Sequence, residues 1–375
     1  MERYLQKFIL KDLNKKMVIL TGPRQVGKTY LAKEILKNFQ KSTYLNFDDI
    51  KDKKIILNKE WALDTEFIVL DEIQKLEKWK TFLKGIYDTK EKRQKILITG
   101  SAKLDIFKQT GDSLAGRYYL YHLFPFSVKE LQHILKPYDA VEKLNRFGGF
   151  PEPFLSDSET ESQRWRKEYY SDIITTDVLD FAKILEIRSI KTLLYLLKVR
   201  VGSPISYSSL AQDLQISVNT VKKYISILEA LNIIFLIRPF HKNISRSILK
   251  EPKVYFFDTG FIDKDDGLKL ENTVAVSLLK HCQFLQDSEG KDVQLHYIRT
   301  KEKKEIDFVI TENNKIVQLI EVKLSDDNPD RNLLYFKKLF PQLEYVQLVH
   351  NLKYELKKDG IKIIPAGEYL SSLAV

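Results

Sequence analysis

The chain has 375 residues, enough for two or three domains with buried cores. Hydrophobic residues make up 43% and charged residues 30% of it, which is typical of a globular protein and excludes a disordered chain. The single cysteine, Cys282, excludes a disulfide framework and a cysteine-based zinc site.

The ends and the apolar runs of the chain predict where it works. The first residues, M-E-R-Y-L-Q-K-F, contain no signal-peptide core. No apolar run approaches the 18 or so residues that a membrane span needs. We therefore expect a cytoplasmic protein without a membrane partner.

The net charge is +10, and it is unevenly distributed. Residues 181–250 carry 11 Lys and Arg against 3 Asp and Glu. A dense basic module of this kind predicts a polyanion partner. A basic surface that is merely solvated is the alternative.

Near the amino end, a strand, a glycine-rich turn and a helix are predicted in succession. Residues 17–20 are an apolar run, residues 22–29 read G-P-R-Q-V-G-K-T, and residues 30–39 have helical periodicity. The middle stretch fits the phosphate-binding loop G-x-x-x-x-G-K-[ST]. Its glycines allow backbone N–H groups to point at phosphate oxygens, and the following helix adds a partial positive charge.

This loop predicts an ATP site with Mg²⁺. Lys28 would reach the β- and γ-phosphates, and the Thr29 hydroxyl would hold the metal ion. The residues expected to contact the nucleotide are Gly22, Pro23, Arg24, Gln25, Val26, Gly27, Lys28, Thr29 and Tyr30.

A second apolar run ends in two acidic residues. Residues 67–70 read F-I-V-L, which predicts a parallel strand buried on both faces, and Asp71 and Glu72 follow. Ligands bind where such strands end, so Asp71 would hold Mg²⁺ through water and Glu72 would act as general base on the attacking water. A strand that simply ends in acidic residues is the alternative.

The remaining elements of residues 1–150 predict the fold class. Helices are expected over 1–15 and 79–89, and strands over 43–47, 95–99 and 118–123. Strands that alternate with helices in this way predict an α/β domain whose parallel sheet has helices on both faces.

Two polar residues of this domain have two interpretations each. Ser101 follows a strand, where it would either sense the γ-phosphate or cap a helix. Arg117 would either stabilise transition-state charge as an arginine finger, and so be catalytic, or form a structural ion pair.

Residues 146–153, R-F-G-G-F-P-E-P, break helix and strand alike and predict the end of the ATPase domain at 150. Residues 151–190 are expected to be a helical connector. The next two domains are then 191–250 and 251–375.

Residues 191–250 predict a helix-turn-helix with a wing. Helices are expected over 207–214 and 218–231, joined by a tight turn, and a strand over 233–237. The exposed face of the second helix carries Asn219, Thr220, Lys222 and Lys223, and Arg238, His241, Lys242, Arg246 and Lys250 follow. These residues would contact DNA bases and phosphates; a protein-packing module is the alternative.

The last domain contains charged residues on two strands, E-I-D-F-V-I at 305–310 and I-V-Q-L-I-E-V-K-L at 316–324. Residues two apart on a strand face the same side, so Glu321 and Lys323 project together and Asp307 can join them. Two carboxylates and a lysine could bind Mg²⁺ for phosphodiester cleavage. A salt bridge between strand residues is the alternative.

Taken together, these motifs resemble one family, the prokaryotic AAA-like ATPases with a C-terminal domain of unknown function 4143. The further residues that carry the resemblance are I-T-G-S (98–101), S-L-A-G-R (113–117), G-G-F-P-E (148–152) and Y-F-F-D-T-G (255–260). The resemblance implies an ATPase, a winged helix and a domain of the PD-(D/E)xK nuclease fold. In that pattern Asp307, Glu321 and Lys323 match the core residues, and Glu271 matches the helix acid.

The resulting prediction is an ATPase that binds and hydrolyses ATP and acts on DNA. One alternative is an ATP-gated, Mg²⁺-dependent nuclease, and another is a signalling ATPase whose winged helix binds protein. A nucleotide kinase is disfavoured by the Asp71-Glu72 pair and the attached basic module. The architecture leaves room for a homo-oligomer or a protein partner.

Overall fold

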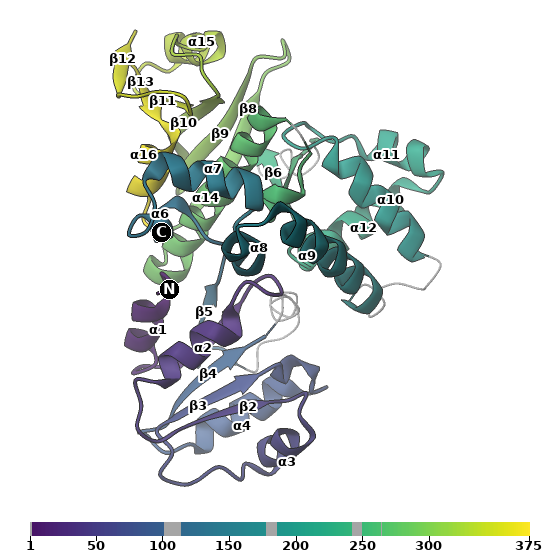
Figure 1. Ribbon diagram of the computed structural model, residues 1–375, viewed down its shortest axis with the longest axis vertical. Helices are drawn as coiled ribbons and strands as arrows, with labels where there is room; N and C mark the ends of the chain where they lie inside the picture. Colours follow the sequence, from purple (N-terminus) through teal and green to yellow (C-terminus); the bar gives the residue numbers. More distant parts are fainter. Residues whose placement is uncertain (1, 101–113, 178–185, 242–249, 264) are drawn as a thin grey trace. The chain divides into compact units, whose positions relative to one another are not determined.

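The computed structural model describes residues 2–100, 114–177, 186–241, 250–263 and 265–375. The chain divides after Phe124 into two units, residues 1–124 and residues 125–375. Each unit has a sheet of its own (Figure 1).

The first unit contains a parallel sheet of five strands in the order β2-β3-β4-β1-β5. The strands are β1 (Met17–Thr21), β2 (Ser42–Asn46), β3 (Phe67–Asp71), β4 (Lys95–Thr99) and β5 (Tyr118–His122). The helices are α1 (Gln6–Asp12), α2 (Lys28–Leu36), α3 (Ile50–Asn58), the short 3₁₀ turn η1 (Ile73–Lys75) and α4 (Trp79–Thr89). The predicted α/β fold with a parallel sheet is confirmed.

The central strands are buried on both faces because helices cover both. Ile68 and Leu70 of β3 join a core with Leu83 and Ile86 of α4. Val69 points to the other face by the alternation of a strand, and α2 contacts β3 and β4. Every residue of β1 and β3 is accordingly buried, which explains why these strands read as continuous apolar runs.

The second unit contains a mixed sheet of eight strands in the order β12-β13-β11-β10-β9-β8-β6-β7. The strands are β6 (Ile234–Pro239), β7 (Lys253–Phe256), β8 (Val293–Arg299), β9 (Glu305–Glu312), β10 (Lys315–Lys323), β11 (Glu344–Val349), β12 (Leu356–Lys358) and β13 (Ile361–Pro365). β6 pairs antiparallel with β7 and parallel with β8, so the strand after the helix-turn-helix belongs to the same sheet as the strands of residues 251–375.

The second unit also contains helices. They are α6 (Val128–Leu131), α7 (Pro137–Phe147), α8 (Pro151–Ser156), α9 (Glu159–Asp172) with the π-helical η3 (Ile173–Asp177), α10 (Glu186–Lys198), α11 (Tyr207–Leu214), α12 (Val218–Ala230), η5 (Thr259–Phe261), α14 (Asp266–Glu289), α15 (Arg331–Leu339) and α16 (Ala366–Ser372). The long α14 contacts β7, β8 and β10, and α15 packs on β9.

Residues 125–150 fold with the second unit, whereas the sequence places them before a boundary at 150. The physical reason is a set of buried polar contacts. The ammonium of Lys280 on α14 forms an ion pair with Glu130 on α6, and both side chains are at least 98% buried. Lys280 also donates to Ser127 Oγ at 3.0 Å. The segment after β5 is therefore fixed to α14.

The end of α7 is fixed in the same way. Asp258 is 1% exposed and forms a 2.8 Å ion pair with Arg166 on α9. Gly148, at the C-terminus of α7, has φ +72° and ψ 176°, and a Cβ there would lie 2.1 Å from Asp258 Oδ1. Only glycine fits this conformation and this space.

This geometry predicts the effect of two alanine substitutions. Gly148→Ala should destabilise residues 125–375 by about 3 kcal/mol or more, because it separates Arg166 from a buried carboxylate and forces a backbone conformation that is almost confined to glycine. Gly290→Ala is the matched control: Gly290 also has a left-handed φ, of +68°, but nothing lies within 4 Å of the added Cβ. We expect it to cost about 1 kcal/mol. Thermal unfolding compares the two; equal losses would show that the Asp258 contact contributes nothing.

Candidate functional site

The predicted phosphate loop connects β1 to α2 with a backbone that glycine makes accessible. Gly22 has φ +141° and Gly27 has φ +99°. A Cβ on Gly22 would lie 2.3 Å from the carbonyl oxygen of Leu123, so no other residue fits there. Gly27 precedes the first residue of α2, whose N-terminal N–H groups therefore face the loop.

Lys28 lies inside this loop. Its side chain is largely buried, with 8% of the residue exposed, and its ammonium donates to Gly22 O at 2.9 Å and to Pro23 O at 2.6 Å. The positive charge is therefore held at the centre of the turn, which is where a phosphate chain on this backbone would need it.

Asp71, at the end of β3, is the centre of a hydrogen-bond network. Thr29 Oγ1 donates to Asp71 Oδ2 at 2.9 Å, which brings together the two halves of the predicted site. Tyr44 OH donates to the same oxygen at 2.5 Å, and Thr99 Oγ1 donates to Oδ1 at 2.5 Å. The Glu72 N–H is a further donor to Oδ1 at 3.1 Å. Both carboxylate oxygens are thus fixed in orientation.

Tyr44 and Thr99 are site residues that the sequence reasoning missed. Thr99 is the last residue of β4 and pairs with Asp71, the last residue of β3. The matching ends of these two predicted strands were the one signal that could have placed Thr99 beside Asp71. Tyr44 comes from β2, two residues before its end, and nothing in its sequence surroundings marks it. Burial, and then its hydrogen bond to Asp71, raises the pKa of the Tyr44 hydroxyl, so it remains a donor.

Glu72 has an unusual backbone. Its φ of +57° is left-handed, which is strained for a residue with a side chain and is typical of functional sites. Its carboxylate accepts from Gln74 Nε2 at 2.8 Å and lies 3.6 Å from the ammonium of Lys75. The side chain is 25% exposed, so it is held in place and remains accessible to water.

Arg117 does not join this site. It precedes β5, whose first residue pairs with Met17, whereas the loop follows Thr21 at the other end of β1. Arg117 therefore lies where the parallel strands begin, whereas the loop lies where they end. There its guanidinium donates to both oxygens of Asp88 at 2.8 and 3.1 Å. Within its own chain Arg117 forms a surface ion pair and cannot reach the loop. Ser101 lies outside the described residues.

The residues of the second predicted site are also close together. Asp307 on β9 accepts at Oδ2 from the Val322 N–H on β10 at 3.1 Å. Lys323 Nζ lies 2.9 Å from Glu321 Oε1 and 3.1 Å from Asp330. Burial, followed by the charge of Asp307, raises the pKa of Glu321. The sequence-predicted Asp307, Glu321 and Lys323 thus form one cluster.

Lys253 on β7 completes this cluster, although it belongs to none of the motifs that predict the site. Its side chain is 1% exposed, and its ammonium lies 2.8 Å from Glu305, 3.2 Å from Asp307 and 3.6 Å from Glu271. Burial alone would lower the pKa of Lys253, but the three carboxylates outweigh burial and raise it. Lys253 is therefore a permanent cation at this position.

These contacts decide whether Mg²⁺ fits among the carboxylates. The ammonium of Lys253 already contacts Glu271, Glu305 and Asp307, so a divalent ion would have to share these carboxylates with a buried cation that repels it. Within the described part of the chain, no group of three or more His, Cys, Asp and Glu side chains is arranged to hold a metal ion. The donor set of this cluster does not fit the metal that the nuclease pattern implies.

The two helices predicted over 207–214 and 218–231 are present as α11 and α12. α11 ends at Leu214, and the next residue, Gln215, has a left-handed φ of +54°. The Ser217 side chain caps α12 by accepting from the Thr220 N–H. Asn219, Lys222 and Lys223 are exposed on α12. Lys223 forms a 3.2 Å ion pair with Glu186, so part of its charge is balanced locally. Lys242 and Arg246 lie outside the described residues.

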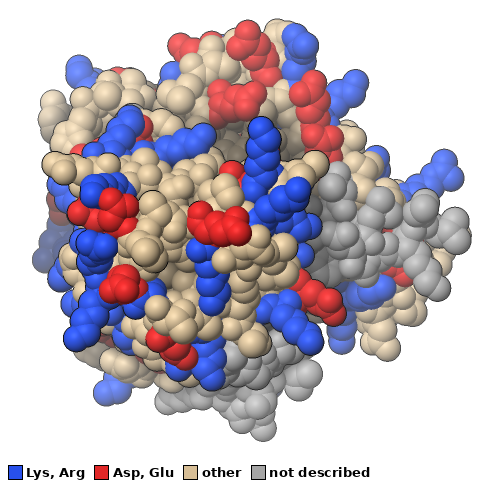
Figure 2. All heavy atoms as spheres, turned by 90° about the horizontal axis from the view of Figure 1, so that it is seen from below, with Lys and Arg blue, Asp and Glu red and all other residues tan. Residues whose placement is uncertain are grey.

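Basic side chains are not gathered on the face seen from below, in Figure 2. There, on the residues drawn in colour, Lys and Arg are interspersed with Asp and Glu. That face thus gives no reason to place a polyanion on it.

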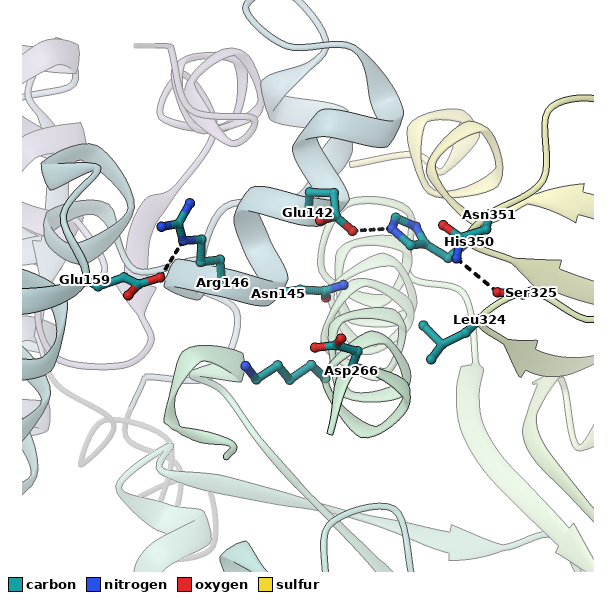
Figure 3. Close-up of a pocket in the computed structure, with 10 residues that line it drawn as sticks. Glu142, Asn145, Arg146, Glu159, Asp266, Leu324, Ser325, His350 and Asn351 are labelled. Carbon is teal, nitrogen blue, oxygen red and sulfur yellow. Dashed lines mark hydrogen bonds and ion pairs between the residues drawn. The ribbon is translucent and has the colours of Figure 1, made fainter. Parts of the chain in front are cut away.

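A cavity of about 330 Å³ lies within residues 125–375 (Figure 3). Glu142 on α7 is hydrogen-bonded to Nε2 of His350, which follows β11, and the His350 ring stacks on Tyr138 with ring centres 4.6 Å apart. Asn351 Nδ2 donates to Ser325 Oγ at 3.0 Å. These contacts join α7 to the ends of β10 and β11, so the residues that line the cavity hold these elements together.

Among the described helices, none is both long and apolar enough to cross a membrane.

Comparisons with known proteins assign three segments of the chain. Residues 14–132 match the model of the AAA domain. Residues 138–269 match a domain of unknown function, DUF8612, and residues 266–369 match another, DUF4143.

Two relatives and one solved structure are similar over most of the chain. An uncharacterized protein of Methanocaldococcus jannaschii is 28% identical over 372 residues, covering 89% of this chain and 81% of the relative. An uncharacterized protein of Haemophilus influenzae is 24% identical and covers 98% of each chain. A Walker-type ATPase of Pyrococcus abyssi is 14% identical, with a TM-score of 0.45, and covers 70% of this chain and 94% of that chain. The family model matches confirm the family that the motifs indicated: the chain carries a P-loop AAA domain and a C-terminal DUF4143 domain.

Proposed function

We propose that the protein binds ATP with Mg²⁺ in the loop of residues 22–29 and hydrolyses it to ADP and phosphate. The observation that carries this proposal is the 2.9 Å hydrogen bond from Thr29 to Asp71. It joins the end of the phosphate loop to the end of β3 beside the buried Lys28, and a P-loop ATPase needs these three groups together.

The residues fit the nucleotide and its metal ion. The loop backbone with Gly22 and Gly27 offers N–H groups to phosphate oxygens, and Lys28 would exchange its carbonyl partners for the β- and γ-phosphates. Thr29 and Asp71 would hold Mg²⁺, which when bound neutralises charge on the phosphates. Tyr44 and Thr99 hold the Asp71 carboxylate in one orientation through this process.

Glu72 is the proposed general base. It would take a proton from the attacking water, and a hydrogen bond from Gln74 holds its carboxylate in place. Its carboxylate contacts Gln74 and Lys75, whereas the Asp71 carboxylate is held by Thr29, Tyr44 and Thr99, so the two neighbouring carboxylates would serve different roles. Arg117 is not part of this mechanism within one chain.

We further propose that the helix-turn-helix of residues 207–230, with the β6–β7 pair as its wing, contacts DNA. The support is the exposed Lys222, Lys223 and Asn219 on α12 and the basic balance of residues 181–250. A signalling ATPase whose winged helix binds protein is the competing function. The strand pair β9–β10 and α14 support a PD-(D/E)xK-like fold for residues 251–375.

Removing the ammonium of the loop tests nucleotide binding. Lys28→Ala should weaken ATP binding by about 100-fold or more, because a charge-assisted contact to phosphate is lost in a largely buried site. Fluorescent nucleotide titration measures this. Lys37→Ala is the matched control. Lys37 is the residue that follows α2, and its side chain contacts Glu34 on the surface. Wild-type affinity in Lys28→Ala would overturn the assignment of the loop.

Replacing the proposed base separates binding from hydrolysis. Glu72→Gln keeps the size of the side chain and removes its basicity, so kcat for ATP should fall by about 100-fold or more while ATP affinity changes by less than about threefold. Phosphate release measures turnover. If turnover is unchanged, Glu72 is not the base.

The DNA proposal predicts a change in salt dependence. The double variant Lys222→Ala/Lys223→Ala should bind duplex DNA more weakly, and the slope of log affinity against log salt should become shallower by about 2, because two phosphate contacts are lost. Lys353→Ala/Lys357→Ala, with both lysines exposed on the same unit, is the control. Wild-type protein that does not bind DNA at low salt would favour the protein-binding alternative.

A further inference from the structure

The cluster around Lys253 is a closed arrangement of charges. Lys253 comes from β7, Glu271 from α14, and Glu305 and Asp307 from β9. The three carboxylates are 16%, 24% and 17% exposed, and the ammonium between them is 1% exposed. One internal cation therefore serves three carboxylates that belong to two other elements.

The loop before α11 covers one side of this cluster. Gly202 has φ +72°, and a Cβ there would lie 2.9 Å from Glu271 Oε1. Its N–H donates to Val254 O, next to Lys253, at 3.1 Å. Tyr255 OH donates to Glu271 Oε1 at 2.7 Å. Glu271 is thus enclosed by protein groups, and a phosphodiester has no direct approach on this side.

Both oxygens of Asp307 are also engaged. Oδ1 lies 3.2 Å from the Lys253 ammonium, and Oδ2 accepts from the Val322 N–H at 3.1 Å. On the other side of Asp307, Glu321 is 7% exposed and contacts the ammonium of Lys323. A lysine therefore lies on each side of the aspartate that the nuclease pattern would assign to a metal ion.

We propose that this cluster is an ionic lock in which Lys253 takes the place of a divalent cation, and that it joins the helix-turn-helix to the C-terminal sheet instead of cleaving DNA. β7 pairs with β6, which follows α12 directly, so Lys253 connects that module to α14 and β9. The lock holds the proposed DNA-contacting module in one orientation within residues 125–375. This inference does not depend on the ATPase assignment.

Metal binding tests the proposal on the full chain without nucleotide. Free Mn²⁺ is measured by electron paramagnetic resonance in titrations of wild type, Asp307→Asn, Lys253→Ala and Lys315→Ala, an exposed lysine of β10 as the matched control. Wild type, Asp307→Asn and Lys315→Ala should give the same curve. Lys253→Ala should bind one more Mn²⁺ per chain, because a positive charge beside the carboxylates is gone. The affinity for this added ion should be at least about tenfold higher than the affinity of wild type for any Mn²⁺ at the cluster. Asp307→Asn in the Lys253→Ala background should abolish that gain.

Two results would overturn the ionic lock. One is a Mn²⁺ ion on wild type that Asp307→Asn removes; the other is Mg²⁺- or Mn²⁺-dependent cleavage of linear or branched DNA that Asp307→Asn abolishes. A folded Lys253→Ala without the added ion would also contradict it. If Lys253→Ala is not recovered in folded form, the wild-type and Asp307→Asn comparison decides alone. Any weak Mn²⁺ binding at Asp71 is the same in all variants, so it does not affect the differences between their titration curves.

Discussion

The hydrogen bonds of one carboxylate, Asp71, hold together the candidate nucleotide site of residues 1–124. Each oxygen of this carboxylate accepts from two donors, so the group cannot rotate without breaking buried contacts. The donors come from α2, β2, β4 and the residue after β3. Because β4 lies between β1 and β3 in the sheet, the end of the phosphate loop is set against β3 through this network and not through strand pairing. The network therefore fixes the distance between Thr29 and the acidic pair, on which the proposed chemistry depends.

Buried charges have a different role in residues 125–375. Three largely buried cations form ion pairs with carboxylates from distant parts of the chain: Lys253, Lys280 and Arg166. A buried charge without a partner is costly, so each pair specifies how two segments meet more than it adds stability. In the phosphate loop, by contrast, Lys28 donates to backbone carbonyl oxygens. Such neutral partners can be exchanged for phosphate without leaving a carboxylate unpaired in the interior.

Local pattern explains which parts of this molecule were predictable. The strands of the parallel sheet, the loop, α11 and α12 follow from short runs of residues, and their bounds agree with the structure to within a few residues. The contact of Thr29 with Asp71 followed from the rule that parallel strands end at one edge. Tyr44 could not be found, because its role depends on β2 lying next to β3. The choice between the two interpretations of Arg117 could not be made for a related reason: a motif gives a residue type, whereas the strand register decides at which end of the strands the residue lies, and there Arg117 pairs with Asp88.

The acidic cluster shows the same limit in terms of charge. The spacing of Asp307, Glu321 and Lys323 specifies where two carboxylates and a lysine meet, and the structure does bring them together. Whether such a group holds a metal ion depends on its total charge and on access, neither of which the spacing contains. Here Lys253, 54 positions before Asp307, supplies a cation, and Gly202 brings the backbone over Glu271. Since an ammonium beside shared oxygens repels a second cation, the proposed ionic lock makes the lysine, and not the motif, the residue that would determine whether this site takes a metal ion.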